Sequence, residues 1–579
     1  MSVNTAPLSD DEITQWFDSP GAVAPNTFEI ALVLGGTVSA GAYTAGALDF
    51  LIEALDSWND AQDAAAAVPR HKVVLRVIAG TSGGGVNAAI AGRALAYDFP
   101  HVARATPLAT AAGNPFYQTW VNGLTLDGML QTSDLDPPGA TPVSLLDGGA
   151  IDQAAAGAIA FTRPALKPRR WLAEPLRLIV TLTNLNGIAY RIGFGEVTLP
   201  DGSTVDLRES YVDHADYARF AVVYPGQAFD APRPDEQVLG FGEARLAQAI
   251  DWPSFGQFAM GTAAFPIGFP PRRLSRPLDH YRYRVVAVPG DANPDATAWL
   301  PLVPDWAAIQ DWGGGLPDTY QFLAVDGGAT DNEPIELART ALAGIGGRNP
   351  RDGMQANRGV VLIDPFAGAN AMAPPLTMAL PDLVGSLVTA LTQQTRYDTR
   401  DLLLAACPDV YSRFMITALR DTKVGDPALA TAGMSAFIGF ACAAFRRHDY
   451  LLGRKNCQDF LRSQFVLPEA SPVFEGALHG VPLEDYLVTD ATGRYLPIIP
   501  LVGAARVPEA TDPWPKNALD PTRYHSAIEA RFKLLLEKEV GTGPLSSVLA
   551  WLVATVGEGK VADVVVAAMQ TALKERDLA

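Results

Sequence analysis

Short apolar runs that end at glycine recur along the N-terminal part of this chain, with amphipathic stretches between them. The two clearest are residues 30–34, which end at Gly35-Gly36, and residues 73–79, which end at Gly80. Wholly apolar runs of this length are typical of strands buried on both faces, and helical stretches between such strands are typical of parallel sheets. The pattern predicts an α/β fold, a three-layer sandwich with a mainly parallel central sheet.

Three further apolar runs, at residues 176–182, 322–325 and 360–363, complete the predicted set of strands. Beyond residue 366 helical stretches dominate and no further strand is predicted. We therefore divide the chain into an N-terminal tail, an α/β domain and a helical C-terminal region, with boundaries at 1–27, 28–370 and 371–579. Two irregular intervals, 98–168 and 197–236, are interpreted as insertions over the sheet, and the first is a candidate lid.

The composition of the 579 residues narrows the classes of partner and location. A formal net charge of −19 argues against nucleic-acid binding. The three cysteines, none in a C-x-x-C spacing, indicate neither a disulfide framework nor a metal site. The polar, acidic N-terminus predicts no signal peptide, and no uncharged apolar run reaches the ~18 residues of a membrane-spanning helix. We expect a cytoplasmic protein.

The strongest local motif is Gly80-Thr81-Ser82-Gly83-Gly84, a G-x-S-x-G. A predicted strand leads into it and an alanine-rich helical stretch leaves it, which is the arrangement of a nucleophile elbow. Glycines on both sides remove Cβ atoms that would clash in such a turn, and the N-terminus of a helix stabilises developing negative charge. The motif predicts that Ser82 is a nucleophile.

A nucleophilic serine needs a base. None of the seven histidines follows a predicted strand, whereas Asp326 comes directly after the run 322–325 and precedes Gly327-Gly328. Because the carboxyl ends of parallel strands meet at one edge of a sheet, we expect Asp326 within about 2.6–3.5 Å of Ser82.

A strand-end G-x-S-x-G paired with a distant D-G-G resembles the patatin-like phospholipases. Four further segments resemble motifs of that family: the glycine-rich loop at 34–46, the strand and turn at 181–187, the helix end at 262–271 and the D-G-G…N-x-P run at 326–334. The resemblance covers residues 28–366 and implies hydrolysis of a lipid carboxylic ester by a Ser82–Asp326 dyad, without metal or cofactor. The implied reaction is that of a phospholipase A, a lysophospholipase or a lipase-like esterase.

The resemblance also implies an oxyanion hole and a set of supporting glycines. The backbone N–H groups of Gly36, Thr37 and Gly83 would bind the oxyanion. The supporting glycines would be Gly35, Gly41, Gly80, Gly84, Gly327 and Gly328.

The oxyanion loop departs from the family pattern. The family usually reads G-G-G-x-R-G, whereas residues 36–41 read GTVSAG, so that Val38 replaces the third glycine and Ala40 the arginine. Two alternatives therefore stay open. One is a catalytically impaired lipid-binding or scaffold protein on the same fold, and the other is a conventional Ser-His-Asp esterase.

Two strongly apolar stretches, 376–391 and 545–556, are interpreted as buried helices or as a wall for acyl chains. We expect the insertion at 98–168 and the apolar helices after Pro375 to enclose a groove that leads to Ser82. The predicted partner is a lipid or acyl-ester substrate. Peripheral membrane contact and the oligomeric state stay open. His448 lies in a charged stretch that we interpret as a structural network between helices.

Overall fold

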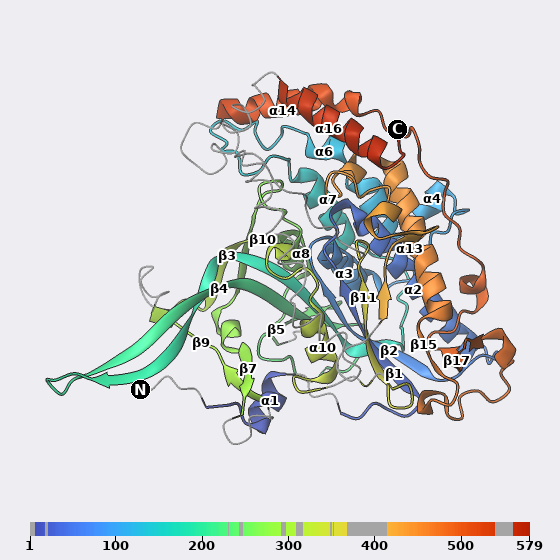
Figure 1. Ribbon diagram of the computed structural model, residues 1–579, viewed down its shortest axis with the longest axis horizontal. Helices are drawn as coiled ribbons and strands as arrows, with labels where there is room; N and C mark the ends of the chain where they lie inside the picture. Colours follow the sequence, from blue (N-terminus) through green and yellow to red (C-terminus); the bar gives the residue numbers. More distant parts are fainter. Residues whose placement is uncertain are drawn as a thin grey trace.

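A mixed ten-stranded sheet forms the centre of the molecule (Figure 1). The computed structural model describes residues 6–17, 21–229, 231–242, 247–290, 297–307, 316–347, 350, 352–367, 414–491, 493–538 and 560–579. The main path of the sheet runs β12-β11-β1-β2-β3-β10-β6. Its strands are β1 (Thr27–Leu34), β2 (Lys72–Gly80), β3 (Leu172–Thr198), β6 (Arg272–Pro277), β10 (Thr319–Asp326), β11 (Arg358–Ile363) and β12 (Phe414–Ile416).

The strands predicted from the sequence are present, and the predicted fold class is confirmed. Neighbours along β12-β11-β1-β2-β3 pair in parallel, whereas β10 runs antiparallel to both β3 and β6. Three more strands join this sheet: β4 (Thr204–Val223) and β9 (Val303–Pro304) pair with β3, and β5 (Glu236–Gly240) pairs with β4.

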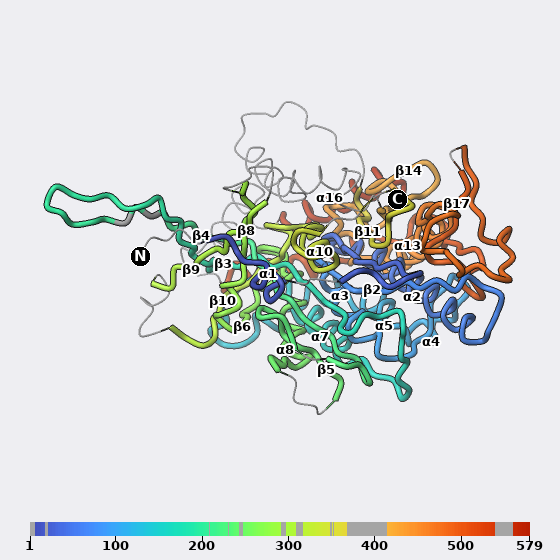
Figure 2. Tube along the Cα trace, turned by 90° about the horizontal axis from the view of Figure 1, so that it is seen from below, coloured from blue at the N-terminus to red at the C-terminus, as the bar shows by residue number. Residues whose placement is uncertain are grey.

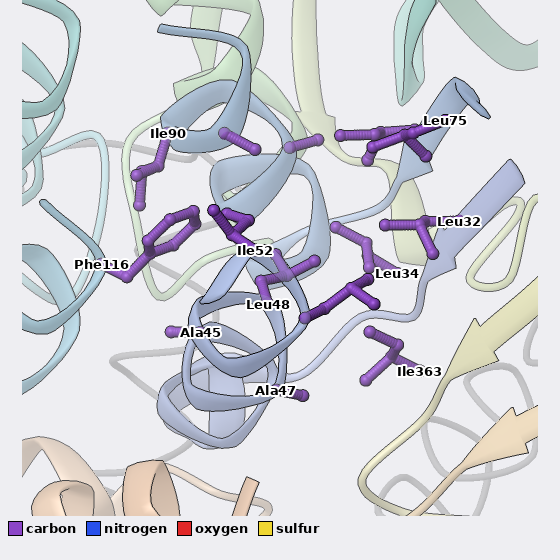
Figure 3. Close-up of a cluster of buried hydrophobic side chains, with 14 of the residues drawn as sticks. Leu32, Leu34, Ala45, Ala47, Leu48, Ile52, Leu75, Ile90, Phe116 and Ile363 are labelled. Atoms are coloured by element: carbon purple, nitrogen blue, oxygen red, sulfur yellow. The ribbon is translucent and has the colours of Figure 1, made fainter. Parts of the chain in front are cut away.

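Helices cover both faces of the sheet, as a three-layer sandwich requires. The helices that pack against the sheet are α2 (Gly41–Asp63), α3 (Gly83–Ala94), α8 (Trp252–Thr262) and α10 (Ile335–Ala343). Alternate residues of β1 face opposite layers: Leu32 and Leu34 join a cluster with Leu48 and Ile52 of α2 (Figure 3), whereas Val33 joins the cluster under α10. This period of two explains why the run is apolar throughout.

The candidate lid, residues 98–168, folds as short helices packed on α3 and α8. They are α4 (Leu108–Ala111), α5 (Pro115–Tyr117), the π-helix η2 (Gln118–Gly123), α6 (Leu126–Met129) and α7 (Gly149–Ile159). Elsewhere the chain forms α1 (Asp10–Trp16), the hairpin of β7 (Val285–Pro289) with β8 (Thr297–Pro301), and the short 3-10 helices η1 (Val38–Ala40), η3 (Leu278–Arg282) and η4 (Gly327–Ala329).

The second interval predicted to be irregular, 197–236, is mostly strand, so that prediction was wrong. β3 and β4 form a long two-stranded ribbon that extends from the body (Figures 1 and 2). Their turn holds Asp201-Gly202, with Gly202 at φ 82°, where glycine is favoured. Apolar side chains stay exposed along the ribbon, and Phe194 retains 71% of its accessible surface.

The sequence predicted a helical region after residue 370, but the described part of that region also contains short strands. β12 extends the central sheet, β13 (Leu419–Arg420) pairs with β14 (Lys423–Val424), and a separate three-stranded sheet is formed by β15 (Val466–Pro468), β16 (Val488–Thr489) and β17 (Arg494–Pro497). Its helices are α13 (Ala443–Ser463), α14 (His525–Lys538), α16 (Val561–Glu575), and the 3-10 helices η5 (Asp426–Ala428), η6 (Ile438–Ala441), η7 (Pro472–Phe474), η8 (Leu483–Asp485), η9 (Gly503–Arg506) and η10 (Pro521–Tyr524).

α13 packs closely along α2. A Cβ atom on Gly46 or on Gly453 would lie closer than 3.0 Å to a backbone carbonyl of the other helix. At the same interface Arg454 forms an ion pair with the buried carboxylate of Asp49, at 2.7 Å. The boundary predicted at residue 370 and the apolar stretches 376–391 and 545–556 lie outside the described residues.

Over the described ranges, none of the helices combines the length and the apolar character that a transmembrane span requires.

Candidate active site

Ser82 stands in a strained turn between β2 and α3. Its backbone has φ 52° and ψ −127°, a conformation that side-chain-bearing residues rarely adopt and that is concentrated at functional sites. The Ser82 N–H donates to Thr262 Oγ1 at 2.8 Å, so the end of α8 holds the turn from outside. This is the geometry that the G-x-S-x-G pattern predicted.

Asp326 is the last residue of β10, and its carboxylate meets the serine. Ser82 Oγ donates to Asp326 Oδ2 at 2.6 Å, although the two residues are 244 positions apart in the sequence. The other carboxylate oxygen accepts the N–H of Gly328 at 2.8 Å. Each oxygen of Asp326 thus has one donor, which fixes the orientation of the carboxylate toward Ser82. The expected separation of the two side chains is confirmed.

The electrostatics of Asp326 favour its use as a base near neutral pH. Burial raises the pKa of its carboxyl to about 6, while the hydrogen bonds from Ser82 and Gly328 lower it. A base is most effective when its pKa lies close to the working pH. The Asp326 carboxylate is therefore more basic than an ordinary carboxylate, whose pKa is near 4.

A set of threonine hydroxyls joins the serine turn to the aspartate turn. Thr81 Oγ1 lies 2.6 Å from Thr181 Oγ1 on β3, and Thr81 also donates to the carbonyl oxygen of Asp331 at 3.0 Å. Thr183 Oγ1 donates to the carbonyl oxygen of Asp326 at 2.8 Å. These bonds connect the ends of β2, β3 and β10, so the separation of the two reacting groups is set by the sheet.

The predicted oxyanion donors differ in whether their N–H groups already have a hydrogen-bond acceptor. The Gly36 N–H donates to the carbonyl oxygen of Asn332 at 3.3 Å, so it is already engaged, which differs from the sequence-based expectation. Among the described hydrogen bonds, the N–H groups of Thr37, Val38 and Gly83 have no acceptor. Val38 and Gly83 line the same cavity as Ser82, whereas Gly36 is not among the residues of its wall.

Most of the predicted glycines have neighbouring atoms so close that an added Cβ atom would clash with them. A Cβ atom would come closer than 3.0 Å to another atom at Gly36, Gly41, Gly80, Gly83, Gly84, Gly327 and Gly328. Gly35 is the exception, because its nearest such neighbour is 3.5 Å away, an ordinary contact. At Gly41 and Gly83 the close neighbours include the ring of Trp120, which the sequence indicated only as one of the aromatic residues of the insertion.

An apolar cavity opens directly over the two side chains. It leaves about 710 Å³ unoccupied by protein atoms, part of it open to solvent, and Ser82 and Asp326 lie in its wall. The rest of the wall comes from Val38, from α3, from α8 and the residues just after it, from the 98–168 insertion, and from Phe440 of the C-terminal region. The residues from the insertion are Thr119, Trp120, Leu124, Met129, Ile151, Ala154, Ala155, Ala158 and Ile159.

Histidine and metal chemistry have no support in the described residues. All seven histidines are described there, and none of them hydrogen-bonds to Ser82. His448 Nδ1 lies 2.8 Å from Asp449 Oδ1, a contact that belongs to a buried network including Thr431. A group of three or more histidine, cysteine, aspartate or glutamate side chains able to hold a metal ion does not occur in those residues.

Comparison with known proteins gives two matches. The sequence pattern of a family described as Patatin-like phospholipase matches residues 32–339. A protein of Sinorhizobium fredii, described as the uncharacterized protein y4iI, is 31% identical over 568 residues, which cover 90% of this chain and 77% of the relative.

Proposed function

This chain belongs to the patatin-like phospholipase family, and we propose on that premise that it hydrolyses carboxylic esters of lipids, with Ser82 as nucleophile and Asp326 as base. Family membership implies a hydrolase that acts on lipid esters. The roles of individual residues are our proposal, and contact with a membrane surface, where such lipids reside, is part of it.

The proposed reaction has two halves. Asp326 Oδ2 accepts the hydroxyl proton while Ser82 Oγ attacks the acyl carbonyl, and the tetrahedral oxyanion is bound by backbone N–H groups of Thr37, Val38 and Gly83. The alcohol leaves with the proton that Asp326 had accepted. In the second half Asp326 takes a proton from water, whose oxygen attacks the acyl carbonyl. The bond between that carbonyl carbon and Ser82 Oγ then breaks, Asp326 returns the proton to Ser82 Oγ, and the fatty acid is released.

The observation that carries this proposal is the hydrogen bond from Ser82 Oγ to Asp326 Oδ2, at 2.6 Å, in the wall of an apolar cavity. A strained serine, a buried carboxylate with a raised pKa and an apolar cavity coincide at this one place. The departure of the loop from the family pattern does not remove backbone donors, because N–H groups do not depend on side-chain identity.

Labelling and lipid hydrolysis test the proposal together. We expect the purified protein to react with a fluorophosphonate probe at Ser82, as located by mass spectrometry, and to release fatty acids from a mixed phospholipid extract. A serine activated by a base forms such adducts, whereas an ordinary surface serine does not. The Ser203→Ala variant, which removes an exposed serine at the turn of the β3–β4 ribbon, is the labelling control. A protein that binds lipids but neither labels nor releases fatty acid would be the non-catalytic alternative.

The cavity wall predicts a preference for long acyl chains. Ala155 of α7 lines the cavity, so the Ala155→Phe variant should fill part of it and displace several methylenes of a bound chain. At up to ~0.8 kcal/mol per methylene, kcat/KM for a p-nitrophenyl palmitate should fall by about tenfold or more relative to the butyrate. The neighbouring Ala156 is exposed and lies outside the cavity wall, so Ala156→Phe should leave this ratio unchanged. An equal ratio in both variants would exclude the cavity as the acyl site.

A further inference from the structure

The oxyanion loop holds a second strained residue besides Ser82. Val38 has φ 48°, a left-handed conformation that is a genuine outlier for a β-branched side chain. Such a conformation persists only where the surrounding structure holds it in place. The family pattern has a glycine at this position, which would adopt the conformation freely, so this chain must supply an external support that the glycine would not need.

That support comes from the next residue along the loop, Ser39. Its side chain is fully buried, and both its N–H, at 3.3 Å, and its Oγ–H donate to the carbonyl oxygen of Ala436. Ala436 lies 397 positions further along the chain, in the C-terminal region. The loop is therefore attached to a part of the protein that lies beyond the family match at 32–339.

The acceptor segment is itself conformationally unusual. Met434, Ser435 and Ala436 have φ values of 53°, 52° and 67°, so three successive residues other than glycine are left-handed. L-residues visit this region rarely, and then usually singly. We refer to residues 433–441, which contain this turn and η6, as the clamp segment. Strain at Ala436 on one side of the contact, and at Val38 next to Ser39 on the other, indicates that the contact is imposed by the fold.

The clamp segment is anchored from two sides. The buried guanidinium of Arg446, on α13, donates to the carbonyl oxygens of Gly439 at 2.6 Å and Phe440 at 2.8 Å, and also to that of Val121 at 2.8 Å. Phe437 packs edge-on against Phe265 in the wall of the cavity, with ring centroids 5.3 Å apart. A side chain on Gly439 would collide with Ser39 Oγ, so that glycine makes room for the contact.

We propose that Ser39 is a positioning residue of the oxyanion hole. Held by the clamp segment, it fixes the N–H groups of Thr37 and Val38 toward the cavity, in place of the third glycine and the arginine that the family loop carries. The C-terminal region thereby completes the active site. This inference rests on the proposed hydrolase function, because it concerns donors that matter only when an oxyanion forms at the substrate carbonyl.

The test compares Ser39→Ala with Ser471→Ala, the same substitution at another buried serine, which lies outside the cavity wall and should keep the wild-type kcat. Ser39→Ala leaves the Ala436 carbonyl paired with the backbone N–H of residue 39, so no buried acceptor loses its last donor. We expect kcat for a p-nitrophenyl ester to fall about 10- to 100-fold, less than or comparable to the loss of one oxyanion donor, with KM unchanged within about twofold. The rate of fluorophosphonate labelling should fall in parallel, since that adduct also places an oxygen in the hole.

The values of kcat and KM decide whether Ser39 positions the oxyanion hole. kcat is expressed per mole of protein that labels to completion, so unfolded molecules do not enter it. A Ser39→Ala enzyme with kcat within twofold of wild type overturns the inference. A Ser39→Ala enzyme whose KM changes along with its kcat also overturns it. If Ser39→Ala yields no folded protein, Ser39→Cys, which fills the space with a weaker donor, is held to the same criterion. Failure of the wild-type protein to label or hydrolyse would instead refute the proposed function.

Discussion

Replacing Ser82 by alanine or Asp326 by asparagine should lower kcat for lipid ester hydrolysis by at least about three orders of magnitude. Both side chains act on the same proton, so loss of either should remove nearly the whole effect of the pair. In the Asp326→Asn variant the new amide could still accept the Gly328 N–H and contact Ser82, but an amide cannot take up the hydroxyl proton. The measurement is single-turnover and steady-state hydrolysis of phospholipid and p-nitrophenyl esters.

The controls separate loss of chemistry from loss of structure. Asp201→Asn, at the turn of the β3–β4 ribbon, makes the same change of charge in an Asp-Gly turn that tolerates asparagine, so it should keep full activity. The wild-type rate should also decline as the pH falls below about 6, because burial raises the pKa of Asp326 to about 6 and a protonated carboxyl is no base. Near-normal turnover by a folded Ser82→Ala or Asp326→Asn enzyme would exclude the dyad.

The Gly453→Ala variant should lower the free energy of unfolding by about 2–4 kcal/mol. A single methyl group at this position of α13 would overlap the backbone carbonyl of Tyr43 on α2, and backbone cannot move aside as a flexible side chain can. The two helices would have to separate, which would weaken the contacts around Arg454 and Asp49. Urea or thermal denaturation followed by circular dichroism measures the change.

Gly157 on α7 provides the matched control, because a Cβ atom there would meet nothing within 4 Å. Gly157→Ala should stabilise the protein by about 0.5–1 kcal/mol through helix propensity alone. Opposite signs for the same substitution in two helices would identify the α2–α13 contact as the cause. If Gly453→Ala instead gained stability like Gly157→Ala, the two helices would not be in close contact.

A chain ended near Phe366 lacks α13 entirely, so we do not expect it to fold.

The parts of the structure that the sequence predicted are those with a local signal. Short apolar runs located the strands, and residues that follow two of those runs, Ser82 and Asp326, lie in contact because the sheet topology brings strand ends together. The β3–β4 ribbon was missed although a signal existed: Asp201-Gly202 between alternating apolar and polar residues is a hairpin pattern.

Other features had no local signal to find. The acceptor of the Gly36 N–H lies in the turn that follows Asp326, and the support of Ser39 lies in the distant clamp segment just before α13. Trp120 gave no sign in the sequence that its ring would pack on Gly41 and Gly83. Contacts of this kind depend on how distant segments are placed in three dimensions, which periodicity and turn patterns do not encode.

The raised pKa of Asp326 has a consequence for folding. In an unfolded chain this carboxyl titrates near 3.8, and in the folded protein near 6, so the folded state binds the proton more tightly between these values. The stabilising contribution of the protonated form is complete below about pH 4 and is lost as the pH rises through about 6. Raising this pKa from 3.8 to about 6 corresponds to about 3 kcal/mol at neutral pH. The ionised Asp326 carboxylate therefore opposes folding at the pH where it acts as a base. We expect the folded state to become more stable when this charge is neutralised by acid, by the Asp326→Asn substitution, or by a bound fatty acid that shares its proton.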